Sequence, residues 1–158
     1  MTVAADPPAP PRSEHKASPS LLYGVKQVEL AVRSHLDEIL KASRVTTLQY
    51  TALTVLRRRD GLTAAQLARN SFVTTQSMAD LVSALERQNF VVRRKDPQDG
   101  RRALISLTAQ GEELLGQHEA AVRALEERML SNLTPAQIRN LRTALNECRE
   151  ALADEPPH

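Results

Sequence analysis

Basic side chains are concentrated in one short part of the sequence, between residues 87 and 102. This stretch contains two acidic residues, Asp96 and Asp99, and six basic ones: Arg87, Arg93, Arg94, Lys95, Arg101 and Arg102. Its net charge of +4 is twice the +2 of the whole 158-residue chain. Because guanidinium groups bind phosphates through charge-assisted hydrogen bonds, the cluster could bind a polyanion such as nucleic acid. The alternative is a charged surface that only contacts solvent.

The basic cluster coincides with a predicted β-hairpin. Strand-like runs at 90–95 and 103–107 flank the turn-forming residues Pro97, Asp99 and Gly100. Proline presets φ, aspartate hydrogen-bonds to nearby backbone, and glycine adopts positive φ. Two strands alone are only marginally stable, so this hairpin must pack on helices. The pattern predicts two arginines, Arg101 and Arg102, at its tip.

Helices are expected on both sides of the hairpin. Apolar residues at three- and four-residue steps predict them at 20–42, 47–58, 64–70, 75–88, 109–131 and 135–153. Thr46, Thr63 and Thr134 each precede a glutamine by three residues, which is the capping-box pattern of a helix start. The short third and fourth helices, joined by a tight turn, indicate a helix-turn-helix.

These elements predict a mainly α fold with a small β-hairpin wing. A winged helix-turn-helix module would span 46–108, with long helices at 19–45 and 109–154 and a flexible, proline-rich arm at 1–18. The apolar stripes of the long helices exceed what the module can cover. We therefore expect them to pair with a second copy of the chain in a homodimer, the alternative being packing within one chain.

The sequence lacks the usual signs of membranes, secretion and catalysis. No apolar run approaches the ~20 residues of a transmembrane helix, and no signal-peptide pattern begins the chain. A lone cysteine, Cys148, fits a reducing compartment, so we expect a soluble cytoplasmic protein without a membrane partner. No glycine-rich phosphate loop, Cys/His metal spacing or nucleophile elbow is present, so no enzyme, cofactor or metal site is expected.

The order of elements resembles the MarR family of bacterial transcription regulators, over roughly residues 20–153. The hairpin is similar to the family's wing signature through Asp96, Asp99, Arg101, Ile105, Leu107, Thr108 and Gly111. The sequence departs from the family at Asn89, where glycine is usual, and at Asp80 and Ala84, where a basic residue is common. The resemblance implies a homodimeric repressor that binds a palindromic operator in double-stranded DNA, associates with the nucleoid, and is released by a small effector such as an aromatic or phenolic anion.

The resemblance also assigns roles to residues of the fourth predicted helix and the wing. With Met78, Leu81, Val82 and Leu85 facing inward, the recognition-helix residues expected to face DNA are Thr74, Thr75, Gln76, Ser77, Asp80, Ser83 and Arg87. Gln76 suits adenine in the major groove. Arg101 suits a narrow minor groove, with Asp99 holding that arginine or the turn in shape. The remaining wing residues expected to contact phosphates are Arg93, Arg94, Lys95 and Arg102.

An effector pocket is expected where the long helices meet the module. Its candidate lining residues are Tyr23, Lys26, His35 and Tyr50, although Tyr50 also suits the core and His35 the surface. Cys148 lies on the apolar stripe of the last helix, where we expect a buried, unreactive thiol. Two alternatives stay open: a redox-responsive regulator, and a winged helix that binds protein and not DNA.

Overall fold

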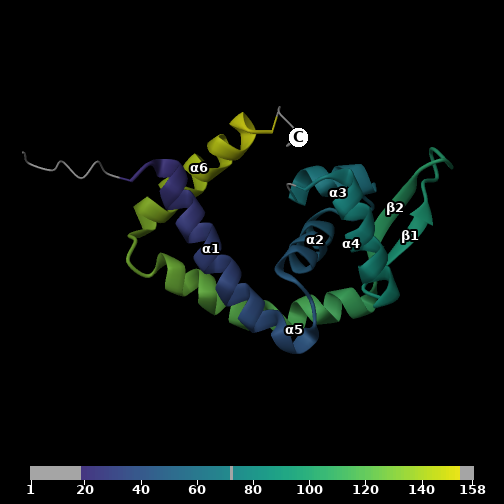
Figure 1. Ribbon diagram of the computed structural model, residues 1–158, viewed down its shortest axis with the longest axis horizontal. Helices are drawn as coiled ribbons and strands as arrows, with labels where there is room; N and C mark the ends of the chain where they lie inside the picture. The colour runs from purple at the N-terminus through teal and green to yellow at the C-terminus, as the bar shows by residue number, and fades with distance from the viewer. Residues whose placement is uncertain (1–18, 72, 154–158) are drawn as a thin grey trace, which may run out of the picture.

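The computed structural model describes residues 19–71 and 73–153; the predicted arm at 1–18 and residue 154 lie outside this range. Helix α1 (Leu21–Leu40) continues into a 3-10 turn, η1 (Lys41–Ser43), and is followed by α2 (Thr47–Arg58), α3 (Ala64–Ser71) and α4 (Thr75–Arg87). The hairpin strands β1 (Val91–Lys95) and β2 (Ala103–Leu107) then lead into α5 (Ala109–Leu130) and α6 (Pro135–Ala151). The predicted fold class is confirmed (Figure 1).

Hydroxyl side chains fix where the helices begin. Thr46 and Thr134 form complete capping boxes with Gln49 and Gln137, and Pro135 occupies the first turn of α6. Helix α1 ends at Leu40, two residues before the predicted end, because residues 41–43 tighten into the 3-10 turn. Arg44 then takes a left-handed conformation with φ of 54° and directs the chain into α2.

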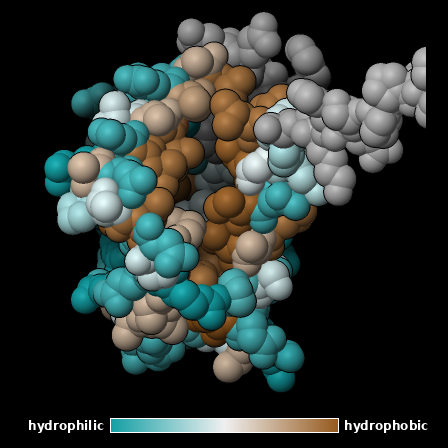
Figure 2. Space-filling model, turned by 90° about the vertical axis from the view of Figure 1, so that its left-hand side faces the viewer, coloured by the Kyte–Doolittle hydropathy of each residue, from teal (hydrophilic) through white to brown (hydrophobic). Residues whose placement is uncertain are grey.

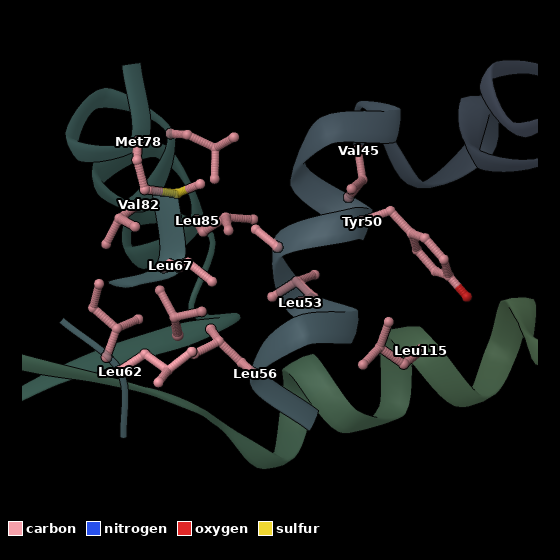
Figure 3. Packing of buried hydrophobic residues seen from close by; sticks show 14 of the residues in the cluster. Val45, Tyr50, Leu53, Leu56, Leu62, Leu67, Met78, Val82, Leu85 and Leu115 are labelled. Carbon is pink, nitrogen blue, oxygen red and sulfur yellow. The ribbon is translucent and has the colours of Figure 1, made fainter. Parts of the chain in front are cut away.

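The core lies between α2, α3, α4 and the hairpin (Figure 3). Leu53 and Leu56 of α2 pack with Leu67 of α3 and with the inward face of α4. Leu40 from the end of α1 and Leu115 from the second turn of α5 are also fully buried. The small module therefore includes parts of two helices that otherwise extend away from it.

A third backbone segment supports the two-stranded hairpin. The strands pair antiparallel from Val91 opposite Leu107 to Lys95 opposite Ala103. Leu62, in the loop between α2 and α3, exchanges two backbone hydrogen bonds with Ile105, at 2.8 and 3.2 Å. The sequence patterns did not predict this bridge. Because both side chains are buried, the base of the hairpin is fixed to the core, whereas its tip extends beyond it.

The first turn of α5 packs tightly on the corner that joins α4 to β1, formed by Asn89 and Phe90. Asn89 has a φ of 60°, a conformation that asparagine tolerates better than most residues. The Thr108 hydroxyl donates to the Asn89 carbonyl oxygen at 2.5 Å, and the Thr108 amide donates to that of Phe90 at 3.1 Å. A Cβ atom at Gly111 would clash with the backbone carbonyl of Phe90. Only glycine permits this approach without movement of the backbone.

The long helices form the other half of the molecule and expose much apolar surface. In Figure 1, α5 runs from the hairpin side to the side where α1 and α6 lie. Figure 2 views this side and shows apolar side chains around a hollow. The large hydrophobic side chains exposed on α1, on α6 and at the C-cap of α6 are Leu21, Leu22, Tyr23, Val25, Val28, Leu30, Leu141, Leu145 and Leu152. No helix within 19–71 or 73–153 combines the length and hydropathy needed to cross a membrane.

Replacing Gly111 with alanine is expected to lower the free energy of unfolding by about 1–3 kcal/mol, the usual cost of overpacking, because the corner would have to move. Gly116→Ala is the matched control, since it lies in the same helix with open space around the added Cβ. Alanine there should be neutral or stabilising by up to about 1 kcal/mol. Urea unfolding followed by circular dichroism measures both, and equal effects would contradict the clash.

Candidate nucleic-acid interface

Helix α4 presents a polar face opposite its buried one. Met78, Leu81, Val82 and Leu85 point into the core, as predicted. The residues of the expected DNA-facing set that are exposed are Thr74, Thr75, Gln76, Ser77, Asp80 and Arg87. Thr74 is the N-cap: its hydroxyl oxygen accepts from the Ser77 amide at 3.1 Å and donates to the Ser77 hydroxyl at 2.9 Å. The start of α4 is therefore already capped within the chain, and its exposed N-terminal turn can approach a groove of DNA.

The structure places Ser83 differently from its predicted outward position. Its side chain is half-buried, and its hydroxyl donates to the backbone carbonyl of Ala79 at 2.9 Å. The same oxygen accepts a hydrogen bond from the Arg93 guanidinium at 3.0 Å. The Ser83 hydroxyl is thus hydrogen-bonded to the wing. The helical periodicity of α4 could not predict this contact, because the partner lies ten residues away in β1.

Two carboxylates shape the wing tip. Asp99 accepts from the Arg101 amide at 3.1 Å, and its own carbonyl oxygen accepts from the Arg102 amide at 2.9 Å. Asp96 accepts from the Gln98 amide at 2.9 Å. The ion pair of Asp99 is formed with Arg102, at 3.5 Å, and not with the guanidinium of Arg101. Of the two predicted roles of Asp99, the geometry matches the one that holds the turn in shape.

The arginines of the wing differ in their surroundings. Within the described ranges, the Arg101 guanidinium forms no hydrogen bond or ion pair, and its side chain is exposed at the tip. Arg94 and Lys95 are also exposed, on β1. Arg93 is exposed as well, but it lies 3.3 Å from the Glu86 carboxylate in addition to its bond with Ser83. The wing therefore contains exposed cations with different partners, because Arg93 is bound to α4 and Arg102 is paired with Asp99.

The four candidate pocket residues do not gather in one cavity of the single chain. Tyr23 and Lys26 lie near the start of α1, where Lys26 pairs with Glu29 at 2.9 Å. Hydrogen bonds from Lys26 and Arg33 lower the pKa of Glu29. His35 lies 2.6 Å from Arg128 of α5.

Tyr50 belongs to the core. Its side chain is 7% exposed, and its ring packs edge-on against His118, with 6.4 Å between ring centroids. Burial raises the pKa of the Tyr50 phenol. A separate hollow of about 270 Å³ lies at the joint between α5 and the corner, lined by Ser43, Phe90, Gln110, Glu113, Leu114 and Gln117. None of the four candidates lines it.

Cys148 is exposed in the single chain, so the burial expected for its thiol would require a surface from a second copy. The apolar stripe on which it lies is itself uncovered, because α6 buries none of its residues in this chain. In the part of the chain that the structure describes, no three His, Cys, Asp or Glu side chains are grouped as a metal site would require.

A helix-turn-helix followed directly by a basic hairpin, with long helices beyond it, defines a winged helix-turn-helix protein. Comparisons with known proteins identify the group. A family model described as the MarR family matches residues 45–102. The HTH-type transcriptional repressor Rv2887 of Mycobacterium tuberculosis is 34% identical over 127 residues, which covers 80% of this chain and 89% of that protein. The chain belongs to the MarR family of transcription regulators.

Solved structures agree with this assignment. The M. tuberculosis MarR family protein Rv2887, in complex with salicylic acid, matches with a TM-score of 0.65 and 32% identity over 84% of this chain and 98% of that one. CouR from Rhodococcus jostii RHA1, bound to p-coumaroyl-CoA, matches with a TM-score of 0.75 over 82% of this chain and 91% of that one. At 22% identity, the likeness to CouR concerns the fold alone.

Removing the Asp99 carboxylate should loosen the wing tip without unfolding the protein. Because one turn hydrogen bond contributes about 0.5–1.5 kcal/mol, the amide of Arg101, which loses its acceptor in Asp99→Ala, should exchange roughly 2–12 times faster. Amide hydrogen exchange measures this directly. Asp80→Ala, which removes an exposed carboxylate from α4, is the control; an unchanged wing in Asp99→Ala would refute the role of Asp99.

Proposed function

We propose that the protein is a homodimeric transcriptional repressor that binds a palindromic operator in double-stranded DNA. The observation that carries the proposal is the joint placement of an exposed, capped α4 face and an exposed cationic wing tip on one small module. Helices of this kind enter the major groove with their N-terminal residues nearest the bases. An arginine on a hairpin tip can at the same time enter the neighbouring minor groove.

The residues of the interface then have distinct roles. Thr75 and Gln76, on the exposed first turn of α4, contact base edges in the major groove, where glutamine pairs well with adenine. Arg101 enters the minor groove, where negative potential is greatest over A·T-rich sequence. The residues that bind phosphates, and so position the module without specifying sequence, are Arg87, Arg94, Lys95 and Arg102. Binding to chromosomal DNA would place the protein on the nucleoid.

The dimer is proposed from the uncovered apolar surface of α1 and α6. Contiguous apolar patches of this kind are rare on monomers and mark interaction sites. A two-fold pair of chains would cover the same face on both copies and would place two α4 helices to read two half-sites. The half-sites would lie about one helical turn apart.

A small aromatic effector is proposed to release the DNA. The relative Rv2887 has been solved with salicylic acid, and CouR, a protein of similar fold, with p-coumaroyl-CoA; both ligands carry an aromatic ring. Tyr23, Lys26, His35 and Tyr50 stay the predicted lining residues. Since they are dispersed in one chain, a pocket that uses several of them requires the second copy. A ligand there would change the spacing of the two α4 helices.

Arg101→Ala is expected to weaken binding by about 1–3 kcal/mol, the scale of one good base contact. The probe is a duplex that the wild-type protein selects from a random DNA library, and binding is measured at about 150 mM salt. Arg139→Ala, which removes an exposed arginine of α6, is the matched control and should bind as the wild type does. Wild-type affinity should also fall steeply as salt rises, and salt-independent binding would argue against DNA as the partner.

Leu145→Glu should convert the dimer to a monomer, because it places a charge on the apolar stripe of α6, where Leu145 is 50% exposed in one chain. Sedimentation velocity over a range of protein concentrations measures the change. Thr143→Glu introduces the same side chain about 200° around the helix, given ~100° per residue, and should stay dimeric. If Leu145→Glu also stays dimeric, the proposed interface is wrong.

A further inference from the structure

Arg93 contacts two residues of α4 at once. One terminal nitrogen of its guanidinium donates to the Ser83 hydroxyl at 3.0 Å, and the other lies 3.3 Å from the Glu86 carboxylate. Ser83 and Glu86 are three residues apart, so they lie side by side on the surface of the helix. The planar fork of arginine spans such a pair, whereas the single ammonium of lysine does not.

The position of Arg93 in the hairpin makes these contacts mechanically important. Arg93 pairs with Ile105, the buried residue that also bridges to Leu62. Within 19–71 and 73–153, Arg93 provides the side-chain hydrogen bonds and ion pairs that join α4 to the hairpin. Beyond it, Lys95 pairs with Ala103 and the tip follows, exposed. At about 3.3 Å per strand residue, Arg101 lies about 13 Å beyond the level of Arg93, so a tilt of about 10° there displaces Arg101 by about 2 Å.

We infer that Arg93 is a positioning residue that holds the wing at a fixed angle to the recognition helix. The inference rests on the proposed function, because it concerns how α4 and Arg101 reach two grooves of one DNA duplex together. Its effect on DNA passes through Arg101, whose entry into the minor groove depends on where the wing points. This positioning role replaces the phosphate contact that charge alone predicted for Arg93, because the Glu86 carboxylate already compensates the charge of Arg93.

The two roles predict opposite results for Glu86→Met. Loss of a negative charge next to DNA should strengthen binding if Arg93 only attracts phosphate. If Arg93 positions the wing, Glu86→Met should weaken binding to the selected duplex about threefold or more, as loss of part of a charge-assisted contact does. Arg93→Lys should weaken it similarly although the charge is kept, and Arg139→Lys, the same exchange at an exposed arginine of α6 outside the proposed DNA interface, is the matched control.

A double-mutant cycle with Arg101→Ala separates positioning from general damage. If the wing is already misplaced in Arg93→Met, removing Arg101 in that background should cost less than half of its effect in the wild type. In the background of Arg94→Met, the effect of Arg101→Ala should be unchanged. Two results together would overturn the inference. The losses of Arg93→Met and Arg101→Ala would be additive, and Arg93→Met would make the dependence of log K on log salt shallower by about 0.9 per lost phosphate contact.

Amide hydrogen exchange of the DNA-free protein keeps the test independent of the proposed function. Exchange across 94–102 should be several-fold faster in Arg93→Met than in Arg94→Met, with unfolding midpoints unchanged. Equal exchange in the two variants would overturn the inference. If the wild type selects no duplex while Arg93→Met still loosens the wing, the proposed function fails and the mechanical link stands.

Discussion

The fold depends on the close approach of α5 to the backbone corner between the recognition helix and the wing. Thr108 bonds to both carbonyl groups of this corner, and Gly111 leaves room for the Phe90 carbonyl. Because backbone contacts backbone there, neither side can shift by rotating a side chain. The start of α5 and the reading elements must move together. A displacement of the long helices is therefore transmitted to α4 and the hairpin as a rigid-body motion.

The electrostatics of the wing depend on which charges are already paired. The sequence counts six cations between residues 87 and 102, but they do not act alike. Asp99 fixes the backbone at the tip and pairs with Arg102, while Arg93 bonds to α4. These pairs are partly solvent-exposed and contribute little stability individually. Their importance is geometric, because they fix the position of the wing tip and leave the Arg101 side chain exposed.

Local signals in the sequence predicted much of this structure. Threonine caps marked the helix starts, and the apolar spacing of α4 identified its buried face, because both depend on residues a few positions apart. The Leu62–Ile105 bridge, the bond between Ser83 and Arg93, and the dispersal of the four candidate pocket residues were not predicted. They depend on how distant segments pack. The burial expected for Cys148 is not provided within one chain, because an apolar stripe predicts a covering surface without indicating which molecule provides it.

Helix α6 buries none of its residues within its own chain. Isolated helices of fewer than about 12–15 residues are marginal in water, and its 17 residues exceed that limit only slightly. A lone copy therefore gains little from keeping α6 helical, and in the proposed dimer association would supply the ordering free energy. If folding of α6 is coupled to the proposed dimerisation in this way, the amount of dimer would depend on the square of the chain concentration when most copies are monomeric. For a regulator, the cellular concentration of the chain would then itself set how much of the proposed dimer is present, before any small molecule binds.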